Sequence, residues 1–256
     1  MLSRIKHLIP KPIKSFLRLI ISLLEQTING LRKILRYIKI KIYKFNRPSQ
    51  ISNYLKSHSI HKFQIGSGDN CLPGWLNTDL YPINDMVFLD AIEPFPFKDN
   101  QFDFIYSEHM IEHISFLDGH RMLKECFRIL RKNGKIRIAT PNLETYLALF
   151  STNQSMHQKK YIQWISTNWL QRSGIPFDNS AFILNLAMHG WGHEFLYDYK
   201  TFESILTNIG FTDIESFKCQ QSNDENFRNL ERHGEFIGNP EMNDFETLIV
   251  EAVKKN

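Results

Sequence analysis

The sequence predicts an α/β fold in which helices cover a largely parallel sheet, preceded by a basic helical arm. Short runs rich in β-branched and aromatic residues alternate with amphipathic helical segments, the pattern of such a sheet. Glycines or carboxylates follow three successive strand candidates, and positive charge is concentrated in the first 50 residues. The 256 residues are 42% hydrophobic, which excludes collagen-like, wholly disordered and multi-span membrane proteins.

Residues 1–50 are expected to form the arm and a linker. They hold 12 Lys or Arg and one acid, Glu25, whereas residues 51–256 hold 19 basic and 26 acidic residues. Apolar residues recur every three or four positions from Ile13 to Phe45, the period of one helix face. Gly30 and the alternating run 38–42 weaken that helix, so two helices are expected, followed by a linker at 46–49.

The arm is not expected to cross a bilayer, because charged residues interrupt every apolar stretch before the ~18 residues that a span needs. Residues 1–12 lack the features of a signal peptide, and the three cysteines are far apart, which predicts a cytoplasmic protein. A basic amphipathic helix favours binding of residues 1–46 to an anionic membrane, peripherally on the inner face of the cell membrane. Packing on the globular domain, or on a second copy in a homodimer, is the alternative.

The globular domain is expected over residues 51–256, with no internal repeat. A helix over 117–131, ended by Asn133-Gly134, joins two strands, and Gly210 ends a helix over 199–208. A helical insertion rich in aromatic residues is expected over 143–195. The predicted strands are 62–65, 75–78, 86–89, 102–106, 135–139, 211–217 and 246–253.

The ends of the first three strands indicate a nucleotide crevice. The first strand is followed by Gly66-Ser67-Gly68, where the missing Cβ atoms let backbone N–H groups approach a ligand. Asp79 ends the second strand, where a carboxylate can accept both ribose hydroxyls, and Asp90 ends the third, near an adenine. The carboxyl ends of parallel strands share one edge, so these groups are expected to converge. Taken alone, the G-x-G run is equally explained as an ordinary turn.

Segments 63–68, 74–79, 95–103 and 130–138 resemble class I S-adenosylmethionine-dependent methyltransferases. The likeness is continuous over about 61–142 and looser over 197–253. It implies a Rossmann-like sheet of seven strands, the last antiparallel, with helices on both faces, and S-adenosylmethionine as the cofactor. Gln64, where an acid is common in the family, and Asn70, where a third glycine is common, depart from the pattern.

The resemblance also implies the contacts of the cofactor. Gly66, Ser67 and Gly68 would line its methionine end, Asp79 its ribose, and Asp90 with Ala91 its adenine. The space before the second strand leaves room only for a very short first helix. The remaining predicted contacts are Asp69, Asn70, Leu80, Ser107 and Glu108.

Candidate catalytic bases follow the fourth strand and close the insertion. Methyl transfer from a sulfonium needs positioned reactants and, for a hydroxyl acceptor, removal of a proton. His193, in the glycine-containing run 188–194, is the first candidate, His109 the second, and His113 a third. His109 and His113 are four residues apart and are expected to share one helical face. The insertion is expected to cover the crevice as a lid, although aromatic residues also suit a core.

Residues 109–113 also match H-x-x-E-H, so a zinc hydrolase is the alternative from another enzyme class. Some class I O-methyltransferases acting on quinone catechols or RNA ends have a similar Glu-x-x-Glu-His run that holds a divalent metal. That resemblance implies His109, Glu112 and His113 as ligands, with His189 or His193 as the fourth, but His109 replaces a glutamate, and no bound metal is expected. In the structural alternative, Glu112 accepts hydrogen bonds from backbone N–H groups.

The sequence therefore predicts an S-adenosylmethionine-dependent methyltransferase that methylates a hydroxyl of a glycan or a lipid-linked sugar intermediate at the cytoplasmic membrane face. The arm and the family's association with surface-polysaccharide assembly suggest this acceptor. The alternatives are a quinone or other small-molecule O-methyltransferase, metal-assisted, and a non-catalytic membrane-associated binding module. Nucleic acid is not an expected partner, because the globular domain is acidic. The polar segment 220–243 is either a second substrate loop or plain surface.

Overall fold

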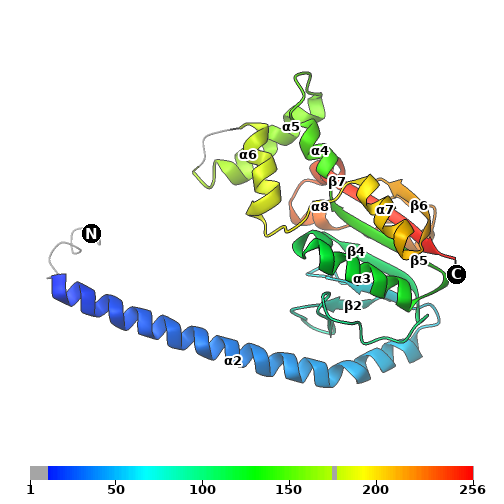
Figure 1. The fold of residues 1–256 in the computed structure, drawn as a ribbon, viewed down its shortest axis with the longest axis horizontal. Helices are drawn as coiled ribbons and strands as arrows, with labels where there is room; N and C mark the ends of the chain where they lie inside the picture. Colours follow the sequence, from blue (N-terminus) through cyan, green and yellow to red (C-terminus); the bar gives the residue numbers. More distant parts are fainter. Residues whose placement is uncertain (1–10, 175–177, 256) are drawn as a thin grey trace. The chain divides into compact units, whose positions relative to one another are not determined.

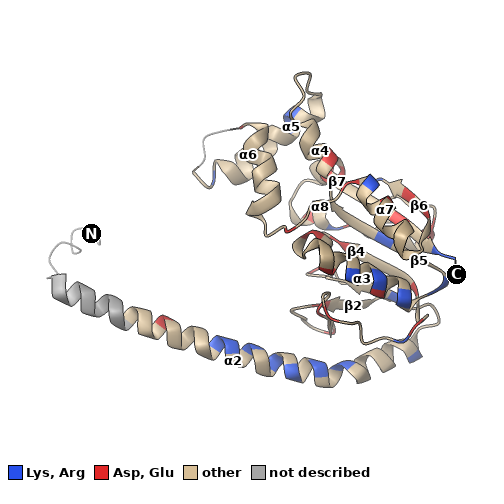
Figure 2. Ribbon diagram, viewed as in Figure 1, with Lys and Arg blue, Asp and Glu red and all other residues tan. Residues whose placement is uncertain are grey.

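The structure is a computed structural model that describes residues 11–174 and 178–255. Contacts between Cα atoms divide the chain into two compact units, 1–48 and 49–256. Helix α2 (Lys11–Ser57) runs through this boundary (Figure 1). Lysines and arginines are frequent along its described part (Figure 2).

The expectation of two helices and a linker at 46–49 is wrong, because α2 continues through both Gly30 and Pro48. A mid-helix glycine costs ~1 kcal/mol and a proline ~3 kcal/mol, which packing elsewhere can offset. Beyond Pro48 the helix is held by buried Ile51 and Tyr54. The Tyr54 hydroxyl lies 2.8 Å from the Lys62 carbonyl oxygen, to which it donates a hydrogen bond.

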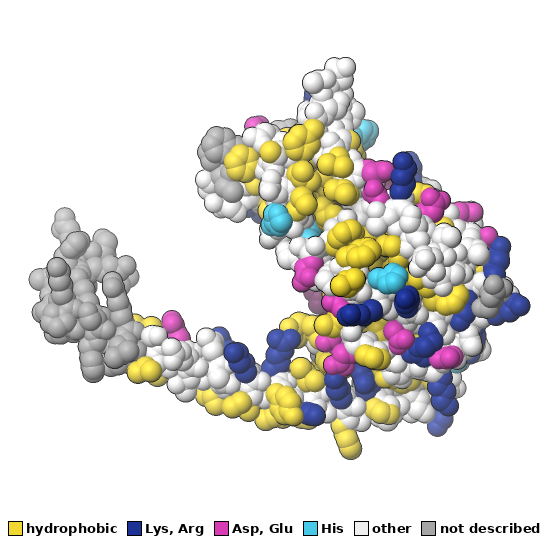
Figure 3. Space-filling model, viewed as in Figure 1, with side chains coloured by type: hydrophobic (Ala, Val, Ile, Leu, Met, Phe, Trp, Pro, Cys, Tyr) yellow, Lys and Arg dark blue, Asp and Glu magenta, His cyan; other side chains and the backbone are white. Residues whose placement is uncertain are grey.

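The described part of the arm presents apolar and basic side chains together (Figure 3). Many of its apolar side chains are 46–58% exposed, among them Ile21, Leu24, Ile28, Leu31, Leu35, Ile38 and Ile42. A search of the described chain for a helix with the length and hydropathy of a membrane span finds none.

The second unit is built on a sheet of seven strands in the order β3-β2-β1-β4-β5-β7-β6, and β7 is antiparallel to β5 and β6. This is the topology that the family resemblance implied. The strands are β1 (Lys62–Ile65), β2 (Leu76–Asp79), β3 (Val87–Phe88), β4 (Phe102–Glu108), β5 (Leu130–Pro141), β6 (Thr212–Phe217) and β7 (Thr247–Lys254).

Strand bounds agree with the sequence predictions within two residues, except at β5. Helix α3 (Phe116–Ile129) ends four residues before Asn133-Gly134, and β5 begins at once with Leu130. Leu130 pairs with Phe102, both are fully buried, and an irregularity in β4 follows this pair. This long-range pairing overrides the local stop signal. The short helix expected between β1 and β2 is also absent from the described chain, where turns fill that space.

Each face of the sheet is covered. Helix α3 and helix α7 (Tyr199–Ile209) lie side by side on one face (Figure 1) and bury Leu123 and Phe202 in the main core. On the opposite face, Tyr106 packs against Phe227 and Leu230 from the β6–β7 connection. That connection, residues 218–246, contains the 3-10 turn η4 (Glu225–Phe227) and helices α8 (His233–Phe236) and α9 (Pro240–Glu246).

A buried ionic group fixes the β6–β7 connection to the sheet. Arg137 of β5 is fully buried, and its Nε lies 2.7 Å from Glu231 Oε1. Its Nη1 forms a second ion pair with Glu251 of β7. Since an unpaired buried charge is costly, each partner of this group requires the others.

The segment between β5 and α7 contains α4 (Leu143–Ala148), α5 (Met156–Ile165) and α6 (Ser180–Asn185). Two single π-turns, η2 (Ser166–Leu170) and η3 (Leu186–Gly190), extend α5 and α6. These elements have a hydrophobic core of their own, which contains Tyr146, Tyr161 and Ile183.

Candidate functional site

The glycine loop after β1 folds against the end of β2. Gly66 and Gly68 have φ angles of 64° and 49°, in the left-handed region that favours glycine. A Cβ atom on Gly66 would lie 2.4 Å from the Met110 side chain. The Gly68 N–H donates to Asp79 Oδ2 at 3.0 Å, so this carboxylate holds the loop in place.

Asp79 and Asp90 lie at the same edge of the sheet. The Leu89 N–H donates to the Asp79 carbonyl oxygen at 3.0 Å, which brings the ends of β2 and β3 together. Asp79 Oδ1 also accepts from the Tyr81 N–H, and Asp90 Oδ1 from the Ile92 N–H. The structure thus brings Gly66, Asp79 and Asp90 to one edge, with Leu80 and Ala91 next in the chain, while their cofactor contacts stay predictions.

A cavity of about 710 Å³, the outer cavity, opens beside the glycine loop. Residues 66–71 and Glu108 line it on the sheet side, and Arg232, His233 and Phe236 line it from the β6–β7 connection. Asp79, Leu80, Asp90, Ala91 and Ser107 are not part of this lining. The Ser107 side chain is buried and donates to the Ile65 carbonyl oxygen at 3.2 Å.

Glu108, at the end of β4, joins the glycine loop to α8. Its carboxylate accepts from the backbone N–H groups of Arg232 and His233 at 2.9 Å each and from the Asn70 side chain at 3.2 Å. Burial raises the pKa of Glu108, and these backbone donors oppose that shift. The contact places His233, a residue that no sequence motif indicated, over the outer cavity.

A second cavity of about 350 Å³, the inner chamber, meets the outer cavity at His109, His233 and Phe236, which line both. Three of the chain's four tryptophans line it. Its other lining residues are Glu112, His113, Pro141, Tyr146, Trp164, Ile165, Trp169, Trp191, His193, Ile237 and Glu246.

His109 and His113 do not share a helical face, contrary to expectation. His109 has a φ of 45°, and the 3-10 turn η1 (Ile111–His113) includes only the second histidine. His109 Nδ1 lies 3.2 Å from Glu112 Oε1, and its ring stacks on that of His233 with 3.8 Å between centroids. The left-handed backbone at His109 therefore separates the two histidines.

Charge is unevenly distributed over these imidazoles. Burial opposes the ionisation of both His109 and Glu112, but their contact raises the pKa of His109 and lowers the pKa of Glu112. Burial, with the nearby His109, lowers the pKa of His233 to about 3. In the stacked pair the charged form is therefore favoured at His109, and His233 is neutral at pH 7.

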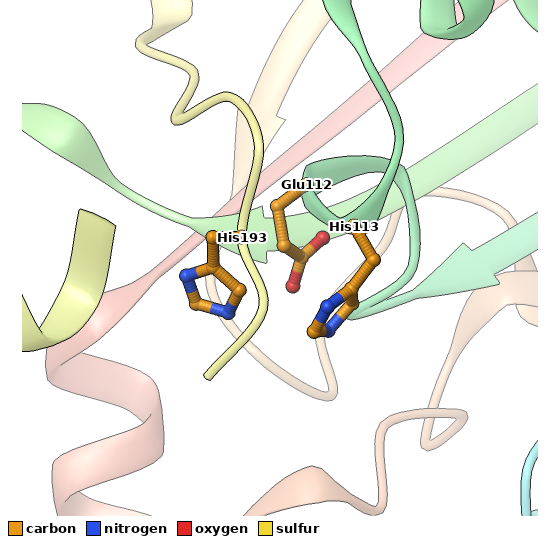
Figure 4. Close-up of side chains that lie close together, drawn as sticks. All are labelled: Glu112, His113 and His193. Atoms are coloured by element: carbon orange, nitrogen blue, oxygen red, sulfur yellow. The ribbon is translucent and has the colours of Figure 1, made fainter. Parts of the chain in front are cut away.

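Glu112, His113 and His193 converge at one wall of the inner chamber (Figure 4). One ligand atom of each lies within 4.8 Å of the others, a spacing that can hold a metal ion. The Glu194 N–H donates to the Glu112 carbonyl oxygen at 2.7 Å, which ties the loop of His193 to η1. Of the predicted metal ligands, His109 pairs with Glu112 instead, and His189 is an exposed residue of η3.

The two histidines of this group have defined tautomers when neutral. His193 Nδ1 lies 2.5 Å from the Ala187 carbonyl oxygen, and His113 Nδ1 lies 3.2 Å from the Gly192 carbonyl oxygen. A carbonyl only accepts, so each Nδ1 carries the hydrogen and each Nε2 keeps its lone pair. Burial lowers the pKa of His193, which leaves it neutral and able to accept a proton at pH 7.

Sequence reasoning missed the chamber's second carboxylate, Glu246. The hydroxyl groups of Tyr146 and Tyr161 both donate to Glu246 Oε2. Glu246 ends α9, 134 residues after Glu112, inside a predicted strand, so no local pattern related the two. The Thr140 hydroxyl donates to Glu112 Oε2 at 3.0 Å, a side-chain contact that differs from the backbone N–H contacts of the structural alternative.

Comparison with known proteins gives one family. Residues 78–138, from the end of β2 through most of β5, match the family model described as a methyltransferase domain. No curated protein matches the chain. Among solved structures, it is similar to a SAM-dependent methyltransferase from Archaeoglobus fulgidus (15% identity, 83% of this chain and 93% of that one, TM-score 0.45). It is also similar to one from Mesorhizobium loti (14% identity, 81% and 97%, TM-score 0.44).

Proposed function

We propose that this chain, an S-adenosylmethionine-dependent methyltransferase of class I, transfers a methyl group to a hydroxyl of a glycan or of a lipid-linked sugar intermediate. The observation that carries the proposal is the junction of the two cavities at His109, His233 and Phe236. The outer cavity has the glycine loop and the volume for the cofactor, and the inner chamber has the bases and aromatic surface for an acceptor.

The chain's own residues position the reactants and take up the proton. S-adenosylmethionine would have its methionine end in the outer cavity and its ribose and adenine at Asp79 and Asp90, along the same edge of the sheet, and it would supply an activated methyl group. The glycine loop binds its methionine end, and the tryptophans of the inner chamber exclude water around the acceptor. As the acceptor oxygen bonds to the methyl carbon and the S–CH₃ bond breaks, the hydroxyl proton moves to His193 Nε2.

A transfer assay with methyl-labelled S-adenosylmethionine and an isolated lipid-linked saccharide fraction tests this function. Label is expected in the saccharide, and His193→Gln is expected to reduce the rate by ~10²–10⁴-fold, as for other general bases. His157→Gln, at an exposed histidine of α5, is the matched control. An unchanged rate in His193→Gln would remove the assigned base, and absence of cofactor binding would remove the function.

The arm supports a site of action at the cytoplasmic face of an anionic membrane. Its half-exposed apolar side chains can enter the headgroup region while its lysines and arginines contact lipid phosphate, at ~1 kcal/mol for each charge. Changing Arg32, Lys33 and Lys39 together to Gln is therefore expected to weaken sedimentation with phosphatidylglycerol vesicles by ~100-fold. Deleting residues 1–46 is expected to abolish it while cofactor affinity is unchanged. Equal sedimentation of all forms would contradict the membrane role.

A metal-assisted O-methyltransferase of quinones or other small molecules is the second candidate, and the convergence of Glu112, His113 and His193 favours it. These residues offer one carboxylate and two imidazoles, a donor set that suits Zn²⁺ and leaves further coordination positions open. A divalent ion there would lower the pKa of an acceptor hydroxyl. Metal analysis of the purified protein, with activity before and after EDTA, separates the candidates, since full activity without metal excludes this one.

A further inference from the structure

We infer that the acceptor held in the inner chamber carries a protonated amine beside its hydroxyl, as a non-acylated amino sugar does. The inference rests on the proposed function and specifies its substrate class. It is drawn from the arrangement of the aromatic rings and from the charges around them.

The three tryptophans of the chamber form adjoining walls at nearly right angles. The rings of Trp164 and Trp169 have centroids 4.8 Å apart and an interplanar angle of 71°. The ring centroids of Trp169 and Trp191 are 5.8 Å apart, and the angle between the ring planes is 76°. In an edge-to-face pair the edge of one ring covers part of a face of the other, but all three rings line the chamber, so part of their aromatic surface borders the space for a ligand. The face of an indole carries negative potential, and it is the preferred aromatic partner of an ammonium ion.

The charge of the chamber has the sign that a cation requires. Among the described residues that line it there is no Lys or Arg, and there are two carboxylates, Glu112 and Glu246. Glu112 is paired with His109. Glu246 is 5% exposed and forms no ion pair with any Lys, Arg or His of the described chain. Its hydrogen-bond partners are tyrosine hydroxyl groups, which are neutral.

A buried carboxylate without a positive partner is costly, and burial accordingly raises the pKa of Glu246. A cation bound in the chamber would supply a positive partner and favour the ionised form. A phosphate or carboxylate at this position would be repelled by Glu246. A neutral sugar ring would stack on the tryptophans but would leave Glu246 uncompensated. A divalent ion would bind at a different group, Glu112 with His113 and His193, and EDTA separates that case from an ammonium.

Tryptophan fluorescence reports the binding of a ligand in this chamber. The fourth tryptophan, Trp75, packs against Tyr106 and Phe227 outside it, and Trp75→Phe removes its signal. In the full chain carrying this change, saturated with S-adenosylhomocysteine and treated with EDTA, two matched pairs are titrated. The pairs are choline with its uncharged isostere 3,3-dimethylbutan-1-ol, and glucosamine with glucose.

The charged member of each pair is expected to bind at least tenfold more tightly, the equivalent of one good cation–aromatic contact. Glu246→Gln is expected to remove most of that preference without weakening the neutral compounds, whereas Glu241→Gln, an exposed control on the same helix, leaves it intact. Equal affinities within each pair in the unmutated chamber would overturn the inference, even if Glu246→Gln failed to fold. If calorimetry shows no binding of S-adenosylhomocysteine itself, the proposed function fails as well. If S-adenosylhomocysteine binds and the chamber does not prefer choline to its uncharged isostere, the inference alone fails.

Discussion

Asp79→Asn is the substitution that tests the nucleotide crevice most directly. In the structure one Asp79 oxygen accepts from the Gly68 N–H at 3.0 Å and the other from the Tyr81 N–H at 2.8 Å. The amide has one acceptor oxygen, so one of these bonds is lost, at about 1 kcal/mol. The charge-assisted bond to a ribose hydroxyl is lost as well, at about 2 kcal/mol. The first loss lowers the stability of the free protein, whereas the second, of about 2 kcal/mol, predicts an affinity for S-adenosylmethionine reduced by roughly 30-fold.

Isothermal titration calorimetry of the full chain with S-adenosylmethionine measures this change. The control is Asp213→Asn, which removes the same charge from β6, the strand at the end of the sheet, where Asp213 pairs with Lys255. Circular dichroism melting shows whether each variant is folded. An Asp79→Asn protein that is folded and binds S-adenosylmethionine within threefold of the unmutated chain would refute the assignment of Asp79 to the ribose.

Three further predictions concern stability. Arg137→Met leaves two buried glutamates unpaired and is expected to lower the free energy of unfolding by ~3–5 kcal/mol, as for other broken buried pairs. Urea unfolding measures this change, and a loss below about 1 kcal/mol would contradict the prediction. The Arg128 contact lowers the pKa of Glu125, so the stability it adds is present above its unfolded pKa of ~4.3 and is lost as the pH falls through the folded value. Glu125→Gln is therefore expected to be less stable than the unmutated chain at pH 7, and in melts across pH the difference is expected to shrink as the pH falls through the lowered pKa of Glu125. Ser115→Ala removes the N-cap of α3, because the Ser115 hydroxyl accepts a hydrogen bond from the Asp118 N–H. The loss is expected to lower the stability by about 1 kcal/mol, and an unchanged melting temperature would contradict this prediction.

The sheet was predictable because its signals are local. Strand 62–65 and helix α7 follow from residue pattern and from the glycine at 210, whose φ of 117° ends the helix. The convergence of Gly66, Asp79 and Asp90 follows from a general rule, that the carboxyl ends of parallel strands share an edge. No contact between distant residues had to be known for these predictions.

The errors arise where distant residues decide the local structure. Helix α2 passes Pro48 because Tyr54 is bound to the main chain of β1, and β5 starts early because Leu130 pairs with Phe102. Similarly, the motif at 109–113 indicated residues that line the inner chamber, but in the wrong arrangement. A left-handed backbone at His109 cannot be read from residue spacing, and it is this turn that directs His109 toward Glu112.

The choice of catalytic base follows from the environments of the histidines rather than from their positions in the sequence. The contact with Glu112 raises the pKa of His109 and so favours its charged form, which has no lone pair to accept a proton. His233, with a pKa lowered to about 3, binds a proton too weakly to be the acceptor. His193 is neutral at pH 7, because burial lowers its pKa, and its Nδ1–H is fixed on the Ala187 carbonyl, which leaves Nε2 free. The sequence ranked His109 second; its contact with Glu112 disfavours it as a base, so that among these three residues His193 is the one we propose for proton removal.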